Sequence, residues 1–381
     1  SEYKMRKILN DHPVWTEALR WFLRQGHRVV FVIGNHDLEL HFINVQRAIM
    51  DVLNVSKELA ENVRFTEWFY ISNKDTLVEH GNQYDPYCMA QDPVNPFILS
   101  FNRLEVRVPF GNLATRYLIN GMGFFNPHLD SNYLMSAAEY VRFFFKYIIK
   151  AQPLLMMTWL WSATVILFQS FSDRLRPSFK DPMAAEDRIE FIAEKANATP
   201  RMVRELRNLF VAPANANPLL ILQELWLDRA FLVVLVFAVI FEVFIFIKAV
   251  YDVSFFWFFI PLFLFLPFFI FYSKSIVSSV IEFKEPVEKI LNLSSMITRV
   301  NRIIYGHTHV ARHEIIGAVE HLNSGTWSPA FKDVECKELI ALKTFIWIEP
   351  SAEDISQRAA LLKVFEKGRA RAFLEGARNA E

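Results

Sequence analysis

The stretch VVFVIGNHDLEL, residues 29–40, joins an apolar run to a group of polar side chains. Residues 28–33 predict a short buried strand, because a run of this length is rich in β-branched residues. Asn35, His36 and Asp37 follow it at once. Side chains that can bind a metal ion or transfer a proton therefore lie at the end of a strand, where α/β proteins commonly place ligand sites.

Two further polar loops follow predicted strands. Residues 80–85, HGNQYD, come after a strand at 76–79, and residues 306–309, GHTH, come after another. If the strands belong to one sheet and end on the same edge, the three loops meet there. An H-x-H pair on an extended segment points both rings to one face, although a single histidine at a strand end is often only a polar loop residue. Asn82 and Asp85 fit a turn role at least as well as a substrate role.

The composition favours an α/β protein with an apolar insert. Lys plus Arg and Asp plus Glu are equal at 41 each among 381 residues, which predicts no nucleic-acid partner. The two cysteines match no disulfide or zinc pattern. Helix and strand alternate at the two ends of the chain. The predicted parts are an N-terminal α/β part, a helical insert, a second α/β part and a C-terminal helix or tail, at 1–98, 99–285, 286–350 and 351–381.

Three segments of the insert are candidate membrane spans, at 151–172, 230–247 and 253–273. A spanning helix needs about 20 apolar residues. The second and third segments are joined by a short turn and predict a transmembrane hairpin; the alternative is a pair of buried core helices. The first contains Pro153 and has basic residues on both flanks, which give no orientation bias. For this segment we expect an interfacial or re-entrant position, or a tight pairing with residues 134–150.

The three polar loops resemble a known family. GNHD at 34–37, HG at 80–81 and GHTH at 306–309 are similar, in order, to the last three of five motifs of the calcineurin-like metallophosphoesterases. NSGTW at 323–327 resembles a segment of the bacterial branch that includes the UDP-2,3-diacylglucosamine pyrophosphatase-like proteins. The resemblance implies a four-layer α/β/β/α sandwich, here interrupted by the membrane hairpin, and the hydrolysis of a phosphoester or pyrophosphate bond.

The resemblance also implies two divalent metal ions, with manganese expected first and iron or zinc as alternatives. Asn35, His80 and His307 would bind one metal, and His309 would bind the other. Mixed nitrogen and oxygen ligands of this kind suit those metals better than calcium.

Two catalytic roles follow from the same resemblance. His36 would face the scissile phosphate and protonate the leaving oxygen or stabilise charge. Asp37 would orient the imidazole of His36, as a carboxylate commonly does for a working histidine.

The first two family motifs, D-x-H and G-D-x-x-D, do not occur before residue 34. NDHP at 10–13 has the wrong spacing. The resemblance therefore implies a chain truncated at its N-terminus, which retains only His309 for the second metal and is inactive or nearly so. The competing interpretation is a family member that never had these motifs, a catalytically inactive membrane protein that keeps the fold for binding.

The position of the insert constrains the membrane topology. It lies between His80 and His307, and both would bind one metal, so the number of membrane crossings between them must be even. We expect a multi-pass protein with its catalytic part on the cytoplasmic side, acting on a lipid-linked phosphate or pyrophosphate at the membrane. The alternative is an enzyme that the hairpin merely tethers and that acts on a soluble substrate.

Overall fold

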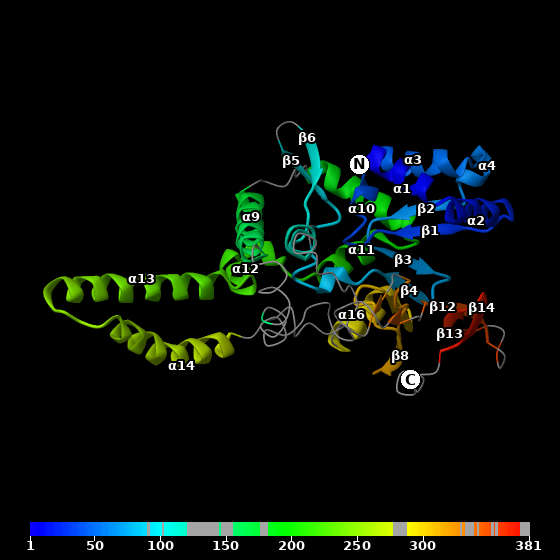
Figure 1. Ribbon diagram of the computed structural model, residues 1–381. Helices are drawn as coiled ribbons and strands as arrows, with labels where there is room; N and C mark the ends of the chain where they lie inside the picture. Colours follow the sequence, from blue (N-terminus) through cyan, green and yellow to red (C-terminus); the bar gives the residue numbers. More distant parts are fainter. Residues whose placement is uncertain are drawn as a thin grey trace.

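A computed structural model describes residues 1–89, 92–100, 103–119, 145, 155–175, 182–276, 288–327, 330–331, 339–340, 343–351, 354 and 357–373. They form an α/β body from which two long helices project (Figure 1). The α/β class expected from the sequence is confirmed.

The larger sheet has five strands in the order β3-β4-β7-β9-β8. These strands are β3 (Phe69–Ser72), β4 (Thr76–Glu79), β7 (Arg302–Tyr305), β9 (Val319–Asn323) and β8 (Arg312–Ile316). Strands β4, β7 and β9 run parallel, and β3 and β8 pair antiparallel at the two edges. Parallel neighbours end at the same edge. The loops after β4 and β7 therefore begin side by side, although they are far apart in the sequence.

Strand β1 (Val29–Val32) belongs to a different sheet. It pairs in parallel with β2 (Val63–Thr66) in a two-stranded sheet. The expectation that all three polar loops follow strands of one sheet is therefore wrong. Glu67 and Trp68 connect β2 directly to β3, the edge strand of the larger sheet, and this connection joins the two sheets.

Helices near the N-terminus cover the smaller sheet. They are α1 (Glu2–Asp11), α2 (Pro13–Arg24), η1 (Leu38–His41), α3 (Ile43–Leu53) and α4 (Lys57–Ala60). Leu9, Leu23, Leu53 and Phe65 belong to one buried cluster. Removing such side chains from water is the main term that holds a strand of four residues in place.

A second core lies on one face of the larger sheet. Helices α10 (Pro182–Lys195), α11 (Pro200–Arg207) and α16 (Glu288–Thr298) contribute to it, together with Trp68 and Ile303. Thr199 caps α11: its hydroxyl oxygen accepts from the backbone N–H of Met202 at 3.3 Å, and Pro200 occupies the first turn.

A third core joins the α/β body to the base of the projecting helices. Its members include Phe110, Ala163, Ile166 and Leu225. The elements of this region are η2 (Asn82–Tyr84), β5 (Phe97–Ser100), β6 (Arg103–Val106), α5 (Phe110–Leu113), the π-helix η3 (Ala114–Ile119), α9 (Leu155–Leu175), η5 (Ala214–Ala216) and α12 (Pro218–Glu224).

The two projecting helices form an antiparallel hairpin. They are α13 (Leu227–Val250) and α14 (Phe259–Ser275), which η6 (Phe255–Phe258) precedes. Among the described helices, the segments 227–250 and 255–275 are long and apolar enough to cross a membrane, and their apolar windows are only 6% buried. Two exposed helices of this composition do not fit the alternative of buried core helices.

The prediction of a C-terminal helix or tail over 351–381 is wrong for residues 358–372. They form β13 (Arg358–Glu366) and β14 (Arg369–Ala372), which pair with β12 (Lys343–Pro350). Alternate side chains of β13 are buried, and Ala360 packs in a cluster with Leu322. That packing against the larger sheet outweighs the helical propensity of the segment. The short pair β10 (Ala330–Phe331) and β11 (Leu339–Ile340) completes the described strands.

Candidate functional site

The three polar loops meet where β1, β4 and β7 end. The backbone N–H groups of Gly306 and His307 both donate to the carbonyl oxygen of His80, at 3.1 and 2.9 Å. Gly34 lies against the ring of His80, since a Cβ atom at Gly34 would be 2.7 Å from Cγ of that ring. The predicted convergence is therefore found, although Asn35 arrives from the smaller sheet.

Asn35 is fully buried and its amide contacts a partner on each side. Its Oδ1 lies 2.9 Å from Nε2 of His80, and its Nδ2 donates to Oδ1 of Asn112 at 3.1 Å. The side chain of Asn112 also donates to the backbone carbonyl of Asn35. The amide oxygen of Asn35 thus points toward His80, as it must if both residues are to bind one cation.

His307 lies opposite a carboxylate. Its Nε2 is 3.0 Å from Oδ2 of Asp85, whose Oδ1 accepts from the backbone N–H of Tyr87 at 2.9 Å. The ligand atoms of Asp85, Cys88 and His307 lie within 4.8 Å of one another. Burial raises the pKa of the Cys88 thiol well above its ordinary value, and Asp85 adds to the shift. A neutral thiol is a poor metal ligand, so Asp85 and His307 are the stronger donors of this group.

The predicted histidines are close enough to affect one another electrostatically. Burial lowers the pKa of His80 well below its ordinary value, and His307, His309 and His36 lower it further. Loss of solvent around the ring and the proximity of His307 lower the pKa of His36. The ring centroids of His80 and His307 are 5.3 Å apart. Neutral imidazole is the form that binds metal, so these surroundings favour ligation.

Asp37 does not contact its expected partner. Its Oδ1 accepts from the backbone N–H of Gly34 at 3.1 Å, and the described contacts include no hydrogen bond to His36. Burial raises the pKa of Asp37 to about 6. The carboxylate holds the turn after β1, while His36 is exposed at the surface of the site. Any orienting effect of Asp37 on His36 therefore acts through the backbone of the turn.

His309 is not on an extended segment. Its φ is +59°, in the left-handed region, and its N–H donates to the carbonyl oxygen of Gly306 at 3.1 Å. The expected geometry, with both rings of the H-x-H pair on one face of a strand, is therefore replaced by a tight turn. This turn still keeps His309 within electrostatic reach of His80.

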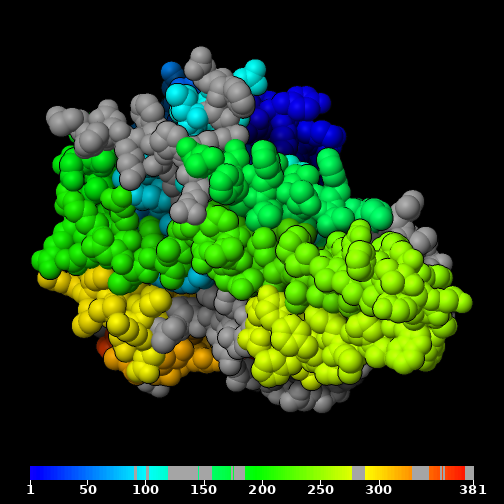
Figure 2. Space-filling model, turned by 90° about the vertical axis from the view of Figure 1, so that its left-hand side faces the viewer, coloured from blue at the N-terminus to red at the C-terminus, as the bar shows by residue number. Residues whose placement is uncertain are grey.

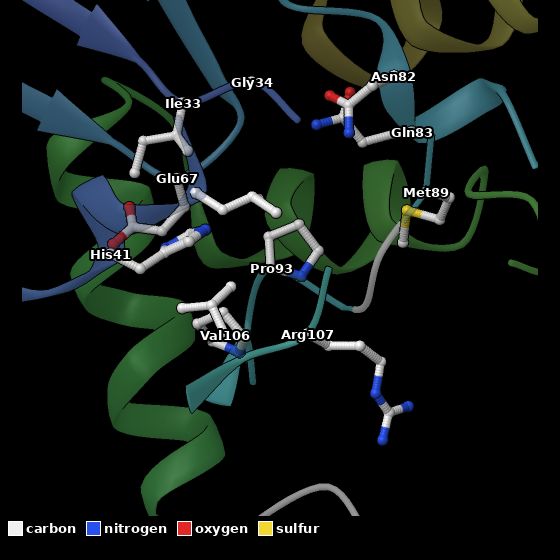
Figure 3. A pocket seen from close by; sticks show the side chains of 12 residues that line it. Ile33, Gly34, His41, Glu67, Asn82, Gln83, Met89, Pro93, Val106 and Arg107 are labelled. Carbon is white, nitrogen blue, oxygen red and sulfur yellow. The ribbon is translucent and has the colours of Figure 1, made fainter. Parts of the chain in front are cut away.

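A pocket opens beside this site (Figure 3). Among the described residues, the buried polar atoms of this pocket without a hydrogen-bond partner include Nδ1 of His41, Oε2 of Glu67, Oδ1 of Asn82 and Oε1 of Gln83. Buried polar atoms normally bond to protein or water, so this wall can bind water or another small polar molecule. The lining residues are Ile33, Gly34, Leu38, His41, Glu67, Asn82, Gln83, Met89, Pro93, Pro96, Val106 and Arg107.

The sequence interpretation missed two contacts of the site. Asp85 lies in a loop that the sequence singles out. The sequence does not distinguish a role in the turn from a role as a metal ligand, because that decision requires the distance between Asp85 and His307. Asn112 lies in α5 and carries no sequence signal that would connect it to Asn35.

Comparison of the chain with models of protein families, with curated proteins and with solved structures finds no match.

Proposed function

We propose that this site binds a divalent metal ion through Asn35, His80, His307 and Asp85, and that it serves the hydrolysis of a phosphoester or pyrophosphate bond. One observation carries the proposal. Three loops from distant parts of the chain place an amide oxygen, two imidazoles and a carboxylate together, with Asn35–His80 and His307–Asp85 contacts of 2.9 and 3.0 Å.

The donor set fits the metals that the family resemblance implies. Amide, imidazole and carboxylate donors suit manganese, iron and zinc. A metal bound there would polarise a phosphoryl oxygen and lower the pKa of a bound water. His36 would act at the exposed mouth of the site, where a ring N–H can donate a hydrogen bond to the phosphate or the leaving oxygen and stabilise its charge. Asn112 would hold the amide of Asn35 in its binding orientation.

The second metal is less well provided for. The sequence assigns only His309 to the second metal, and His309 lies within the described part of the chain. This observation favours the second candidate function, a catalytically inactive protein that binds one metal ion and keeps the fold for recognition. The two candidates predict the same metal ligands and differ in turnover.

The hairpin supports a membrane location for either candidate. If α13 and α14 cross the membrane, the chain crosses twice between His80 and His307, which satisfies the requirement for an even number. We propose a multi-pass protein with the site on the cytoplasmic side and a lipid-linked phosphate or pyrophosphate as substrate. A soluble substrate is the alternative.

Calorimetric titration of the full chain in detergent with Mn²⁺ tests the metal site. We expect one site, lost in Asn35→Ala, His80→Ala and His307→Ala. The matched control is His313→Ala, because His313 bonds to Glu320 on the edge hairpin. Binding that survives all three site variants would refute the proposal.

Phosphate release in the presence of Mn²⁺ separates the candidate functions. The substrates are a lipid pyrophosphate in detergent and nitrophenyl phosphate in water. Turnover of the lipid alone supports the membrane substrate, and turnover of both supports the tethered enzyme. Metal binding without any turnover supports the inactive binding protein.

A further inference from the structure

Helix α9 is apolar on two opposite faces. One face is buried and includes Ala163 and Ile166, which pack with Phe110 of α5 and with Leu225. The other face is exposed to solvent. Its large side chains recur at helical spacing and are Met157, Leu160, Trp161, Phe168, Phe171 and Leu175. A helix that is apolar all round is normally covered on every side, so the outer face needs a partner.

The polar group on the outer face is already satisfied within the helix. The hydroxyl of Thr164 donates to the carbonyl oxygen of Leu160 at 2.7 Å. Trp161 and Phe168 are the most exposed of the large residues on this face, at 72% and 71%. A tryptophan among aliphatic and aromatic side chains is typical of the layer between water and lipid chains.

The inner face of α9 is joined to the base of the hairpin. Leu227, the first residue of α13, packs against the same cluster that includes Ala163 and Ile166. Figure 1 shows α9 beside the point where the hairpin leaves the body, and Figure 2, seen from the hairpin side, shows α9 running across the view above the hairpin. The axis of α9 is therefore turned across the axes of α13 and α14.

We propose that α9 is an interfacial helix, whose outer face lies in the headgroup layer of the bilayer that α13 and α14 cross. The proposal rests on the membrane location of the hairpin and does not require hydrolytic activity. A helix across the base of a spanning hairpin lies in the plane of the membrane, which is how amphipathic interfacial helices bind. It also agrees with the even number of crossings, because α9 then adds none.

This placement brings the metal site toward the membrane surface through a short chain of contacts. The inner face of α9 packs on α5 through Phe110 and Leu113. Asn112 of the same short helix bonds to Asn35 of the site. The site is therefore linked to the proposed lipid-facing surface through two helices in contact, α5 and α9.

Depth-dependent fluorescence quenching in the full chain tests the proposal. A dansyl amino acid is introduced by nonsense suppression at Trp161 or Phe168, so that the native cysteines remain. The references are Phe263 on the hairpin and Phe191 on α10, both exposed aromatic positions. Each protein is reconstituted in phosphatidylcholine vesicles that contain nitroxide lipids, labelled either near the headgroup or at the end of the acyl chain.

We expect several-fold stronger quenching at Trp161 and Phe168 by the headgroup-side nitroxide than by the chain-end nitroxide. Phe263 should show the reverse order, and Phe191 should respond to neither. The proposal would be overturned if quenching at Trp161 and Phe168 were no stronger than at Phe191. It would also be overturned if Trp161 and Phe168 were quenched more strongly by the chain-end nitroxide, as expected for Phe263, because α9 would then be a spanning helix. An absence of quenching at Phe263 would show that the hairpin is not in the membrane, and this result would also overturn the proposal.

A second measurement avoids the foreign side chain. The tryptophan fluorescence of the unmodified chain is compared with that of Trp161→Phe in the same vesicles. The difference isolates Trp161, and it should be quenched preferentially by the headgroup-side nitroxide. A difference signal that is insensitive to lipid nitroxides would refute the interfacial position even if a labelled variant fails to fold.

Discussion

Gly34→Ala is expected to weaken metal binding while leaving every proposed ligand in the chain. Gly34 has no positive φ, so alanine can adopt its backbone conformation. The difficulty is space: a Cβ there would lie 2.7, 2.8 and 2.9 Å from Cγ, Cδ2 and Nδ1 of the His80 ring. Carbon atoms normally approach to about 3.5–4.0 Å. The ring must therefore move by roughly 1 Å.

Such a shift is large for a metal ligand. The Nε2 atom of His80 is 2.9 Å from Oδ1 of Asn35, and metal–ligand distances tolerate only about 0.2 Å. We expect Mn²⁺ affinity to fall roughly 10- to 100-fold, the loss found when a partner that orients a ligand is removed. Overpacking should also lower the free energy of unfolding by about 1–3 kcal/mol.

Gly306→Ala is the matched control, because it alters the glycine of another loop at the same site. A Cβ there would lie 3.4 Å from Oγ of Ser324 and 4.0 Å from Nδ1 of His80, which is close to ordinary contact. Calorimetry should therefore give nearly the affinity of the unaltered chain. Equal affinities for Gly34→Ala and the unaltered chain would refute this reasoning, and so would an equal loss in both glycine variants.

Three further predictions concern other parts of the chain. Asp85→Asn removes the negative charge opposite His307 and should lower Mn²⁺ affinity roughly 10-fold by calorimetry, whereas unchanged affinity would exclude Asp85 as a ligand. Burial lowers the pKa of His41 from 6.5 to about 3. The unfolded chain therefore binds this proton more tightly, and stability is complete above pH 6.5 but falls as the pH drops toward 3. Between pH 7.5 and 5 the free energy of unfolding should fall by about 2 kcal/mol, since the loss begins near pH 6.5 and amounts to about 1.4 kcal/mol per pH unit. Denaturant unfolding of His41→Leu should not show this fall. An identical pH dependence in the variant and the unaltered chain would contradict the prediction. Thr199→Ala removes the cap of α11 and should lower the free energy of unfolding by about 1 kcal/mol, while an unchanged transition midpoint would show that the cap contributes nothing.

Local patterns in the sequence were sufficient for several elements. The strand before Asn35 and the strand at 76–79 depend on neighbouring residues, and both are found. The partner of β1 depends on residues 63–66. No local pattern states that β1 pairs with β2 rather than with β4, and this is why the one-sheet expectation failed.

The C-terminal error has a definite physical cause. Seven of the nine residues of the segment 358–366, RAALLKVFE, are alanine, leucine, arginine, lysine or glutamate, which have high helix propensity. Its alternate residues Ala360, Leu362 and Val364 are nevertheless buried, and Lys367 and Gly368 have the two positive φ values, +49° and +77°, of a tight hairpin turn. Tertiary packing on the larger sheet decides the outcome, and that sheet cannot be seen from within the segment.

The site itself was predictable only as a set of loops. The order of GNHD, HG and GHTH identified Asn35, His80 and His307, and the structure brings these three together. The contact of Asp85 with His307 depends on the path of the loop after β4. The contact of Asn112 with Asn35 depends on how the insert folds back, for which the sequence has no short-range signal.

The parallel pairing of β4 with β7 has a consequence for biosynthesis. Residues 80–301 are translated between these two strands, and they include the whole hairpin. Until β7 leaves the ribosome, the backbone groups of β4 on that side have no strand to pair with, and open strand edges promote aggregation. This edge of β4 therefore stays open while the intervening segment, which includes the hairpin, is synthesised. His307 is the last of the four proposed ligands in the sequence, so the site is completed only after the intervening 222 residues (80–301) have been synthesised.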